Sequence, residues 1–550
     1  MEILLSRLTA LMDEAAASLT QASFSTVVRD AHDYALILMS PKGEVIAENS
    51  YGLVAFVTTM PAVMKNLLKQ FPAESWSPDD AVITNDPWLG VGHVLDLAMA
   101  TPIFYKNSLV AFQGSIVHVP DIGGVVWSAD SRDVFEEGIL IPPLKAFRQG
   151  QPDETLFRLL EANNRLPDQF MGDLYARLAA AETCRTGLLE ILEDEGIDDL
   201  AQACSAMFEL SEATMRRAIS ACEDGVYRAQ VEMDGVNSPL TIAVTIQIEG
   251  SEISVDFSGT SAQVPAAINV CPIETQALAM YPLKCALDPE SPRTEGSYRP
   301  ISVTAPKGTL LNPTFPAAMN ARQITSHYVN AAIFKALAPV IPDRVIAHSG
   351  SPHMQVVFSG ETEQGAPFTA LIFDHPGMGA RPTQDGLTAT HFPGNVATNS
   401  VEIIEATTPL QIVRRDIAGD SGGAGRYRGG CGLDIAIQVA TDTPVVASVL
   451  GDRITHPAEG LFGGLAGAPA AISVNGVPAP TKSRMIVQPG DVVEYREAGG
   501  GGYGPPTERS REMLLSDLRN GYVSPGSAIR YYVLSEDDVQ GIIQVQGRGE

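Results

Sequence analysis

The chain contains two copies of one short spacing, in which an aspartate follows a histidine after two intervening residues. The copies are Gly92-His93-Val94-Leu95-Asp96 and Val117-His118-Val119-Pro120-Asp121, and the whole chain has nine histidines. Imidazole nitrogen and carboxylate oxygen together suit Zn, Mn or Fe(II), and three protein ligands leave coordination positions open for water. An open position is what catalysis needs, so the doubled spacing predicts a catalytic divalent metal site.

The same spacing has a plainer interpretation. A histidine in a turn often forms a hydrogen bond with a nearby aspartate, and a short H-x-x-D is far less specific than a cysteine-rich zinc motif. Just upstream, Asn85 and Asp86 stand in a turn-rich loop that ends at Gly90. That loop either places both side chains beside the same site or forms an Asx turn closed by Pro87.

The elements that must position these motifs follow from hydrophobic periodicity. Residues 1–25 predict an amphipathic helix, and the apolar runs within 35–47, broken by Ser40-Pro41-Lys42-Gly43, predict a hairpin. Between 80 and 145, short apolar runs alternate with Gly, Pro and Asp. This pattern predicts a sheet with loops, and both histidine motifs lie where such runs meet loops.

The rest of the chain changes character twice. Residues 153–223 are rich in Leu, Ala, Glu and Arg and predict three or four helices, whereas 239–258 returns to a strand pattern. Residues 508–520 predict a terminal helix. We therefore expect a mixed α/β (α+β) fold with β-rich N-terminal and C-terminal parts and a helical middle segment. The expected segments are 1–150 with the metal motifs, 151–225 helical, 226–430 central α/β, and 431–550 β-rich with a terminal helix.

Composition restricts the partners and the compartment. The net charge of −28 argues against binding to nucleic acid or to an anionic membrane surface, because both require a basic face. No apolar run is long enough to span a bilayer, and the start does not resemble a secretory signal. Six cysteines without a C-x-x-C pair favour free thiols, so the sequence predicts a cytoplasmic protein. It also lacks a G-x-x-x-x-G-K-[ST] loop, so ATP has no recognisable cradle on this chain.

Motifs along the whole chain resemble one known family. They include Asn85-Asp86-Pro87, Gly92-His93 with Asp96, His118-Val119-Pro120-Asp121, Glu137-Gly138-Ile139, Gly377-Met378-Gly379-Ala380-Arg381 with Asp385, Asp420-Ser421-Gly422-Gly423, and Gly499-Gly500-Gly501-Gly502. At these residues the chain resembles the hydantoinase B/oxoprolinase family. That family includes N-methylhydantoinase and lactamase subunits, part of 5-oxoprolinase, and relatives in acetone and acetophenone carboxylases.

The resemblance implies roles for individual residues. The metal ligands would be His93, Asp96 and His118; the catalytic proton acceptors would be Asp121 and Asp86; and the substrate-binding residues would be Asn85, Arg381 and Asp385. A carboxylate three residues beyond a ligand can orient that imidazole or accept a proton from water, which is the reason for naming Asp121.

The implied reaction is the ATP-dependent opening of a cyclic amide such as a hydantoin, oxoproline or lactam. A hydantoinase A-type partner subunit would phosphorylate the carbonyl with ATP, and this chain would complete the hydrolysis within a hetero-oligomer. Two alternatives stay open. One is a subunit of an ATP-dependent ketone carboxylase, and the other is a non-catalytic scaffold that shapes the active site of its partner.

The chain departs from the family at one stretch. Many relatives carry Ile-Pro-x-His-x-Gly-x-Met, whereas this chain reads Leu53-Val54-Ala55-Phe56-Val57-Thr58-Thr59-Met60. If the histidine of those relatives touches substrate, Phe56 favours a different or more hydrophobic substrate.

Overall fold

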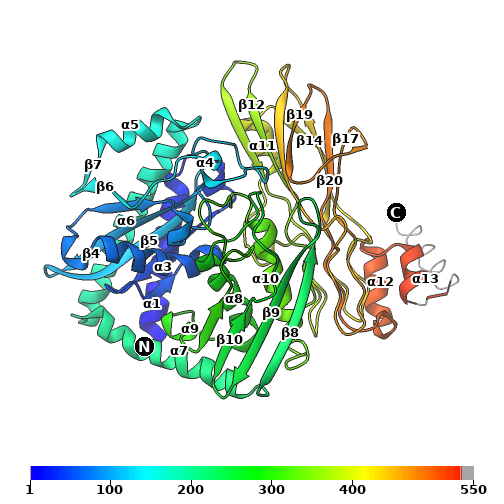
Figure 1. Ribbon diagram of the computed structural model, residues 1–550, viewed down its shortest axis with the longest axis horizontal. Helices are drawn as coiled ribbons and strands as arrows, with labels where there is room; N and C mark the ends of the chain where they lie inside the picture. The colour runs from blue at the N-terminus through cyan, green and yellow to red at the C-terminus, as the bar shows by residue number, and fades with distance from the viewer. Residues whose placement is uncertain (1, 533, 536–550) are drawn as a thin grey trace.

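The computed structural model describes residues 2–532, 534 and 535. The described residues form four β-sheets and a set of helices between and around them, which confirms the expected mixed α/β class. The sheets follow one another along the molecule, from the N-terminal sheet in blue through the central sheet in green to the C-terminal sheets in yellow and orange (Figure 1). Among the described residues, no helix has both the length and the apolar character that crossing a membrane requires.

The N-terminal sheet has seven strands in the order β2-β1-β5-β4-β3-β6-β7. Its strands are β1 (Tyr34–Met39), β2 (Val45–Glu48), β3 (Ala81–Thr84), β4 (Asp96–Tyr105), β5 (Ser108–His118), β6 (Leu144–Arg148) and β7 (Gln151–Pro152). The short helices and turns of this part are α2 (Thr26–Arg29), η1 (Ala73–Ser75), η2 (Pro87–Leu89) and α4 (Val134–Glu137). The longer helices that pack with it are α1 (Glu2–Ala22), α3 (Val54–Gln70), α5 (Glu154–Ala162), α6 (Pro167–Glu195) and α7 (Leu200–Ser220).

The hairpin of β4 and β5 is the element that matters most for the site. Its two-residue turn consists of Lys106 and Asn107, with φ values of 47° and 65°. Positive φ at both turn residues is the backbone conformation that matches the right-handed twist of paired strands. The two strands pair in antiparallel register up to the open end of the hairpin, where Asp96 lies opposite His118. The hairpin thus joins the two histidine motifs at one point.

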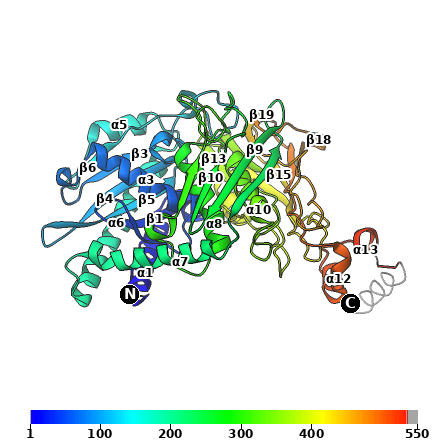
Figure 2. The same ribbon diagram turned by 60° about the horizontal axis from the view of Figure 1, so that its bottom comes forward.

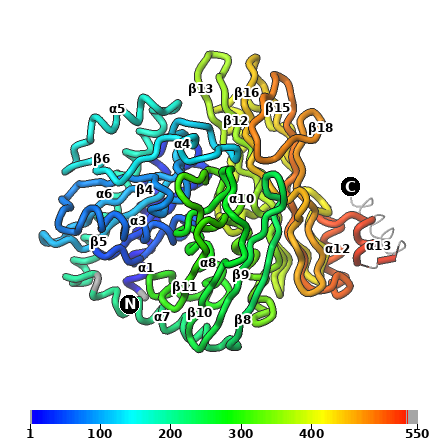
Figure 3. Tube along the Cα trace, viewed as in Figure 1, coloured from blue at the N-terminus to red at the C-terminus, as the bar shows by residue number. Residues whose placement is uncertain are grey.

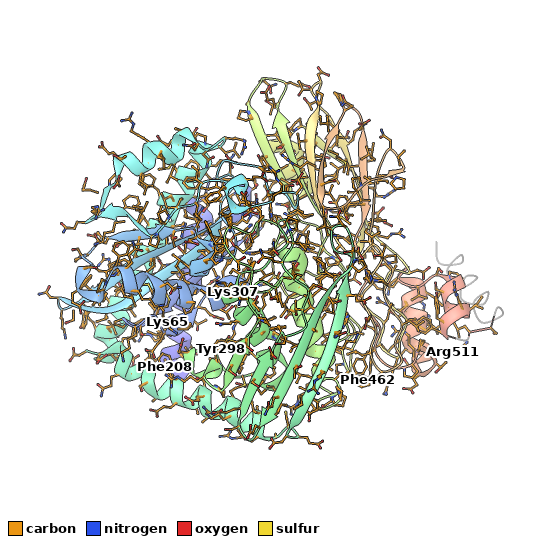
Figure 4. All side chains as sticks on the ribbon, viewed as in Figure 1. Lys65, Phe208, Tyr298, Lys307, Phe462 and Arg511 are labelled. Carbon is orange, nitrogen blue, oxygen red and sulfur yellow. The ribbon has the colours of Figure 1, made fainter. Side chains whose placement is uncertain are left out.

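The central sheet has the order β11-β10-β9-β8. Its elements are β8 (Gly225–Met233), β9 (Leu240–Glu249), β10 (Glu252–Asp256), β11 (Ile301–Thr304), α8 (Pro272–Leu287), α9 (Glu295–Tyr298) and α10 (Gln323–Leu337). Helix α10 packs on β8, β9 and α8, and every residue of it except Lys335 is buried. In Figure 2, α7 runs below this sheet beside α1. Lys65 of α3 and Tyr298 of α9 lie near each other in Figure 4, and the Lys65 ammonium pairs with Glu295 at 2.6 Å.

The C-terminal part contains two antiparallel sheets around a second apolar core. One sheet has the order β13-β12-β16-β19, with β12 (Gln355–Glu361), β13 (Pro367–Ile372), β16 (Val445–Leu450) and β19 (Ser483–Val487). The other has the order β14-β15-β20-β17-β18, with β14 (Leu410–Ile417), β15 (Leu433–Val439), β17 (Ala471–Val474), β18 (Val477–Pro478) and β20 (Val492–Arg496). The remaining elements are α11 (Val401–Thr407), η3 (Pro506–Glu508), α12 (Arg511–Arg519) and α13 (Pro525–Tyr532). Both sheets take strands from either side of residue 430.

The glycine-dense segments pack their backbones directly against one another. A Cβ atom on Gly499 would overlap the carbonyl oxygen of Ser421, and one on Gly429 would overlap that of Gly500. These segments run side by side between the C-terminal sheets and α12 (Figure 3). Glycine is required here by close approach of neighbouring backbones rather than by turns alone.

Most of the expected elements are confirmed. The helix predicted over 1–25 is α1, the hairpin predicted over 35–47 is β1 and β2, the helices predicted over 153–223 are α5, α6 and α7, and the tail helix is α12. The strand pattern over 239–258 corresponds to β9 and β10. Helices α3, α8 and α10 were not predicted. Because α10 is buried on nearly all sides and α8 over most of its length, they lack the one-sided periodicity that marks a surface helix.

Candidate metal centre

Two histidines and one aspartate come together at the open end of the β4–β5 hairpin. Ligand atoms of His93, Asp96 and His118 all lie within 4.8 Å of one another, and all three side chains are buried. Asp96 begins β4 and His118 ends β5, and the two face each other in the register. His93 precedes the strand by one turn, with its carbonyl accepting from the backbone N–H of Asp96 at 3.0 Å. The three predicted ligands therefore converge, as the doubled spacing indicated.

The orientation of His93 is fixed from outside the hairpin. Its Nδ1 lies 2.9 Å from the carbonyl oxygen of Asn320 and 3.0 Å from Oδ1 of the same residue. Both oxygens accept, so Nδ1 carries the hydrogen. Nε2 of His93 is then the atom left for a cation, and it lies 3.1 Å from Oδ1 of Asp96. A metal-binding histidine commonly donates its other ring N–H to a carbonyl in this way.

His118 completes the cluster as an unprotonated imidazole. Both ring nitrogens of His118 are buried and have no hydrogen-bond partner among the described residues. Burial, together with the neighbouring His93, lowers the pKa of His118 to about 3. The plainer interpretation of the motif required a histidine satisfied by a nearby aspartate, and His118 is not satisfied in this way. A neutral imidazole with a free lone pair is a metal ligand in the required protonation state.

Asp96 is held as a carboxylate by a buried arginine. Burial alone raises the pKa of Asp96, but His93 and Arg322 outweigh it and keep the pKa below the ordinary value. Nη2 of Arg322 donates to Oδ2 of Asp96 at 2.6 Å, and its Nε lies 2.8 Å from Oε2 of Glu274 in α8. Arg322 therefore links the hairpin to α8 and to the start of α10.

Gly92 makes room for this arginine. Its φ is +95°, and a Cβ atom at this position would overlap the guanidinium of Arg322. Glycine is thus required for both its backbone conformation and the space it leaves.

The cluster lines a small buried pocket with a volume of about 70 Å³. Its walls include the three cluster residues, Arg322, Trp127 and the apolar side chains Phe56, Leu278 and Phe373. Phe56 is 2% exposed and comes from α3, so the stretch that departs from the family motif does form part of this wall. A larger and more open hollow of about 710 Å³ lies against β17 and β20, and none of the predicted site residues lines it.

The structure adds Asp33, which the sequence motifs did not reveal. Asp33 is 4% exposed, lines the same pocket, and its carbonyl accepts from the backbone N–H of His118. Burial raises the pKa of Asp33 well above its ordinary value, and the charge of Asp96 adds to the effect. Asp33 precedes β1, which pairs with β5, so only the sheet topology places it here.

Two predicted proton acceptors lie outside the described lining of the pocket. The carboxylate of Asp121 accepts from the backbone N–H of Arg165 and forms an ion pair with its guanidinium. Asp86 caps η2 by accepting from the backbone N–H of Trp88 at 2.9 Å. The Asx turn, one of the two alternatives that the sequence left open for the Asn85-Asp86 loop, is therefore present.

The three predicted substrate-binding residues also lie outside the described lining. Asn85 is fully buried; its amide donates to the carbonyls of Val94 and Ile139 and thereby fixes the loop that carries His93. Arg381 donates to the carbonyl of Asp385, and the Asp385 carboxylate pairs with Arg509 at 2.7 Å. Both of these belong to the glycine-dense C-terminal region.

The cluster fits a divalent metal on the chemistry of its donors. It offers two imidazole nitrogens and one carboxylate, it is buried, and one imidazole has no other partner among the described residues. This donor set suits Zn, Mn or Fe(II), the ions named from the sequence.

Comparison with known proteins identifies the family. A model of the hydantoinase B/oxoprolinase family matches residues 1–506. The chain belongs to this family. The B-type component of a putative D-/L-hydantoinase from Pseudomonas sp. (strain NS671) is 30% identical, over 95% of this chain and 93% of that protein. The delta subunit of acetophenone carboxylase from Aromatoleum aromaticum is 26% identical, over 92% of this chain and 82% of that protein.

One family member has a solved structure that superposes along nearly the whole chain. The ATP-dependent caprolactamase from Pseudomonas jessenii is 27% identical, with a TM-score of 0.89 over 98% of this chain and 96% of that chain. The resemblance drawn from the motifs is thus confirmed, and the architecture described above is that of the family.

Proposed function

We propose that this chain is the metal-binding, hydrolytic subunit of an ATP-dependent enzyme that opens cyclic amides. The observation that carries the proposal is the cluster of His93, Asp96 and His118 in a small buried pocket. Membership in a family with hydantoinase and caprolactamase subunits supports both the substrate class and the use of ATP.

Activation by a partner subunit would account for the use of ATP, although this sequence carries no G-x-x-x-x-G-K-[ST] loop. The carbonyl of a cyclic amide is a poor electrophile, and phosphorylation of its oxygen creates a good leaving group. The pocket of about 70 Å³ is too small for a nucleotide. We therefore assign ATP binding to a hydantoinase A-type partner subunit in a cytoplasmic hetero-oligomer.

His93, Asp96 and His118 would hold the metal, which when bound supplies Lewis acidity toward a carbonyl or a water molecule. Other side chains of the pocket set its charge and its access to water. Arg322 compensates the negative charge of Asp96 and Glu274, and the rings of Trp127 and Phe56 exclude bulk water from the pocket. A dry pocket strengthens every electrostatic interaction with the reacting carbonyl.

Proton transfer falls to carboxylates that line the pocket. Asp33 and Glu274 both do so, and burial raises the pKa of Glu274 to about 7, with Arg322 opposing the effect. A pKa near neutrality suits a general base. The resemblance to the family implied that Asp121 and Asp86 accept protons. This role stays a prediction, because the hydrogen bonds of both carboxylates give them structural roles.

The decisive experiment is reconstitution with the ATP-binding partner. We expect the complex to open a cyclic amide with one ATP consumed per turnover, and the isolated chain with ATP to be inactive. Labelled bicarbonate and a panel of ketones complete the test, because a relative belongs to a carboxylase. Label in a β-keto acid, without ring opening of any cyclic amide, would reassign the chain to the carboxylases. Turnover unaffected by His93→Ala would instead support a scaffold role.

A further inference from the structure

A second polar surface lines the same pocket, and it shares no residue with the metal cluster. It consists of Gln323, His327 and Asn330 on α10, together with His353 and His391, and we call it the amide-recognition face. The first three residues are spaced i, i+4 and i+7, so they lie on one side of the helix. A ladder of rings joins the two sites: His118 packs on Trp127, Trp127 on Phe373, and Phe373 on His353.

The polar groups of this face are buried and unpaired. Both amide atoms of Gln323 and of Asn330, Nδ1 of His327 and of His353, and Nε2 of His391 have no hydrogen-bond partner among the described residues. The five side chains are between 3% and 8% exposed. A helix buried on all sides normally presents apolar residues, and unpaired buried polar atoms call for a ligand or for ordered water.

The face carries no charge that would bind an anion. Burial lowers the pKa of His327 to about 3 and those of His353 and His391 well below their ordinary values, so the imidazoles are neutral. The arginine in the described lining, Arg322, is already paired with Asp96 and Glu274. A carboxylate or phosphate placed against this face would be a buried charge with no free cationic side chain among the described lining residues, which is unfavourable.

A second metal does not fit the face either. The ring centroids of His353 and His391 are 4.5 Å apart, and that of His327 lies 5.3 Å from His391. However, the three histidines do not form a group of ligand atoms that all lie within 4.8 Å of one another. Within the described part of the chain, His93, Asp96 and His118 form such a group. Moreover, Nδ1 of His391 already accepts from the backbone N–H of Val396.

We propose that the amide-recognition face selects an uncharged ring that carries more than one amide group, a cyclic ureide or imide, over a ring that carries a carboxylate. The inference rests on the proposed function and narrows its substrate class. Carboxamides and neutral imidazoles offer both donors and acceptors, and a ring with alternating N–H and C=O groups satisfies both. A simple lactam supplies only one such pair, and the apolar wall with Phe56 contacts the rest of a small ring.

Equilibrium binding to the full chain tests this proposal without turnover. The probes are hydantoin, 2-pyrrolidinone and 5-oxoproline, measured by calorimetry. We expect hydantoin to bind about tenfold or more tightly than 2-pyrrolidinone, because a site built for hydrogen bonds rejects analogues that lack them. We expect no measurable binding of 5-oxoproline at the same concentrations. Binding of 5-oxoproline at least as tight as that of hydantoin, or no binding of any probe, would overturn the proposal.

Two variants and a control locate the effect. Asn330→Leu keeps the branching and the number of side-chain heavy atoms but removes the donor and acceptor, so the preference for hydantoin over 2-pyrrolidinone should fall about tenfold. Gln323→Met serves the same purpose if Asn330→Leu does not fold. The control is Thr325→Val, since the Thr325 hydroxyl donates to the carbonyl of Ile268 and lies outside the described lining. A preference that both pocket variants leave unchanged would overturn the assignment.

Turnover by the reconstituted complex separates the two proposals. If the complex opens none of the three rings but the binding preference holds, the recognition face stands and the proposed reaction fails. If the complex opens 5-oxoproline most efficiently, the reaction stands and the recognition face fails.

Discussion

The carbonyl oxygen of Asn320 lies 2.9 Å from Nδ1 of His93 and also accepts a hydrogen bond from Nε1 of Trp127 at 2.6 Å. One backbone oxygen from the loop before α10 thus orients a predicted ligand and the aromatic wall of the pocket together. The loop is itself anchored, because Oε1 of Glu137 accepts from the backbone N–H groups of Met319 and Asn320. The geometry of the candidate centre therefore depends on contacts more than 180 residues apart in the chain.

Removal of both imidazoles should empty the metal site. In the double variant His93→Ala/His118→Ala, the metal content measured by elemental analysis after dialysis should fall from about one ion per chain to nearly none. His456→Ala is the matched control, because that imidazole pairs with Asp234 outside the pocket. Full occupancy in the double variant would show that these residues are not the ligands.

Gly92→Ala should destabilise the protein by displacing Arg322. The added methyl group meets the guanidinium at a positive φ, and we expect a loss of about 1–3 kcal/mol in the free energy of unfolding. Gly476→Ala isolates the backbone strain, since Gly476 has a φ of +76° and no atom within 4 Å of its Cβ position. Chemical denaturation measures both. Equal losses in the two variants would contradict the steric role of Arg322.

Glu137 should make stability fall as the pH rises. Burial raises the pKa of Glu137 from 4.5 to about 8, although the backbone N–H groups of Asn320 and Met319 oppose the rise. A carboxyl whose pKa is raised by folding stabilises the fold below its ordinary pKa, and this contribution is lost as the pH rises toward 8. Glu137→Gln should remove the dependence, on the order of a few kcal/mol.

Unfolding curves at a series of pH values measure this effect as the difference between variant and wild type. Glu136→Gln is the neighbouring control, because hydrogen bonds from Arg132 lower the pKa of Glu136 and its contribution has the opposite sign. A difference between Glu137→Gln and wild type that does not grow as the pH rises would contradict the assignment.

Asp33→Asn should impair turnover more than Asp121→Asn does. Asp33 lines the pocket and burial keeps its carboxyl protonated, so loss of this proton-transferring group should lower kcat by about a hundredfold or more, with little change in the melting temperature. Asp121→Asn weakens the ion pair with Arg165, so its main effect should be on the melting temperature. If Asp121→Asn instead abolished turnover at an unchanged melting temperature, Asp121 would be the proton acceptor, as the family resemblance implied.

The convergence of His93, Asp96 and His118 could be predicted from the sequence because the three residues belong to one hairpin and the turn before it. A doubled motif at the two ends of neighbouring strands needs only local antiparallel pairing to converge, and the pairing of Asp96 with His118 supplies it. Arg322, Asn320 and Asp33 could not be predicted in the same way. They reach the cluster through α10 and through the order of the strands, which are contacts that periodicity does not encode.

The predicted catalytic and substrate-binding residues lie outside the described lining of the pocket for a different reason. Asn85, Asp121 and Asp385 belong to motifs of the family, and each makes several structural hydrogen bonds. A recurrent motif marks a residue with a strict role, but the sequence does not distinguish a role in folding from one in chemistry. The histidines of the amide-recognition face illustrate the converse, because they lie in no motif that spacing could reveal.

The direct backbone contacts of Gly429 and Gly499 affect how the protein can evolve. Any side chain there collides with a carbonyl of a neighbouring segment, so every substitution at these positions requires a shift of the backbone. Residues such as Phe56 and Asn330 instead line a pocket, where their side chains face a space open to a ligand. A change in the pocket thus leaves the glycine-rich framework sterically undisturbed, and the segments that look least structured in the sequence have the least room for a side chain.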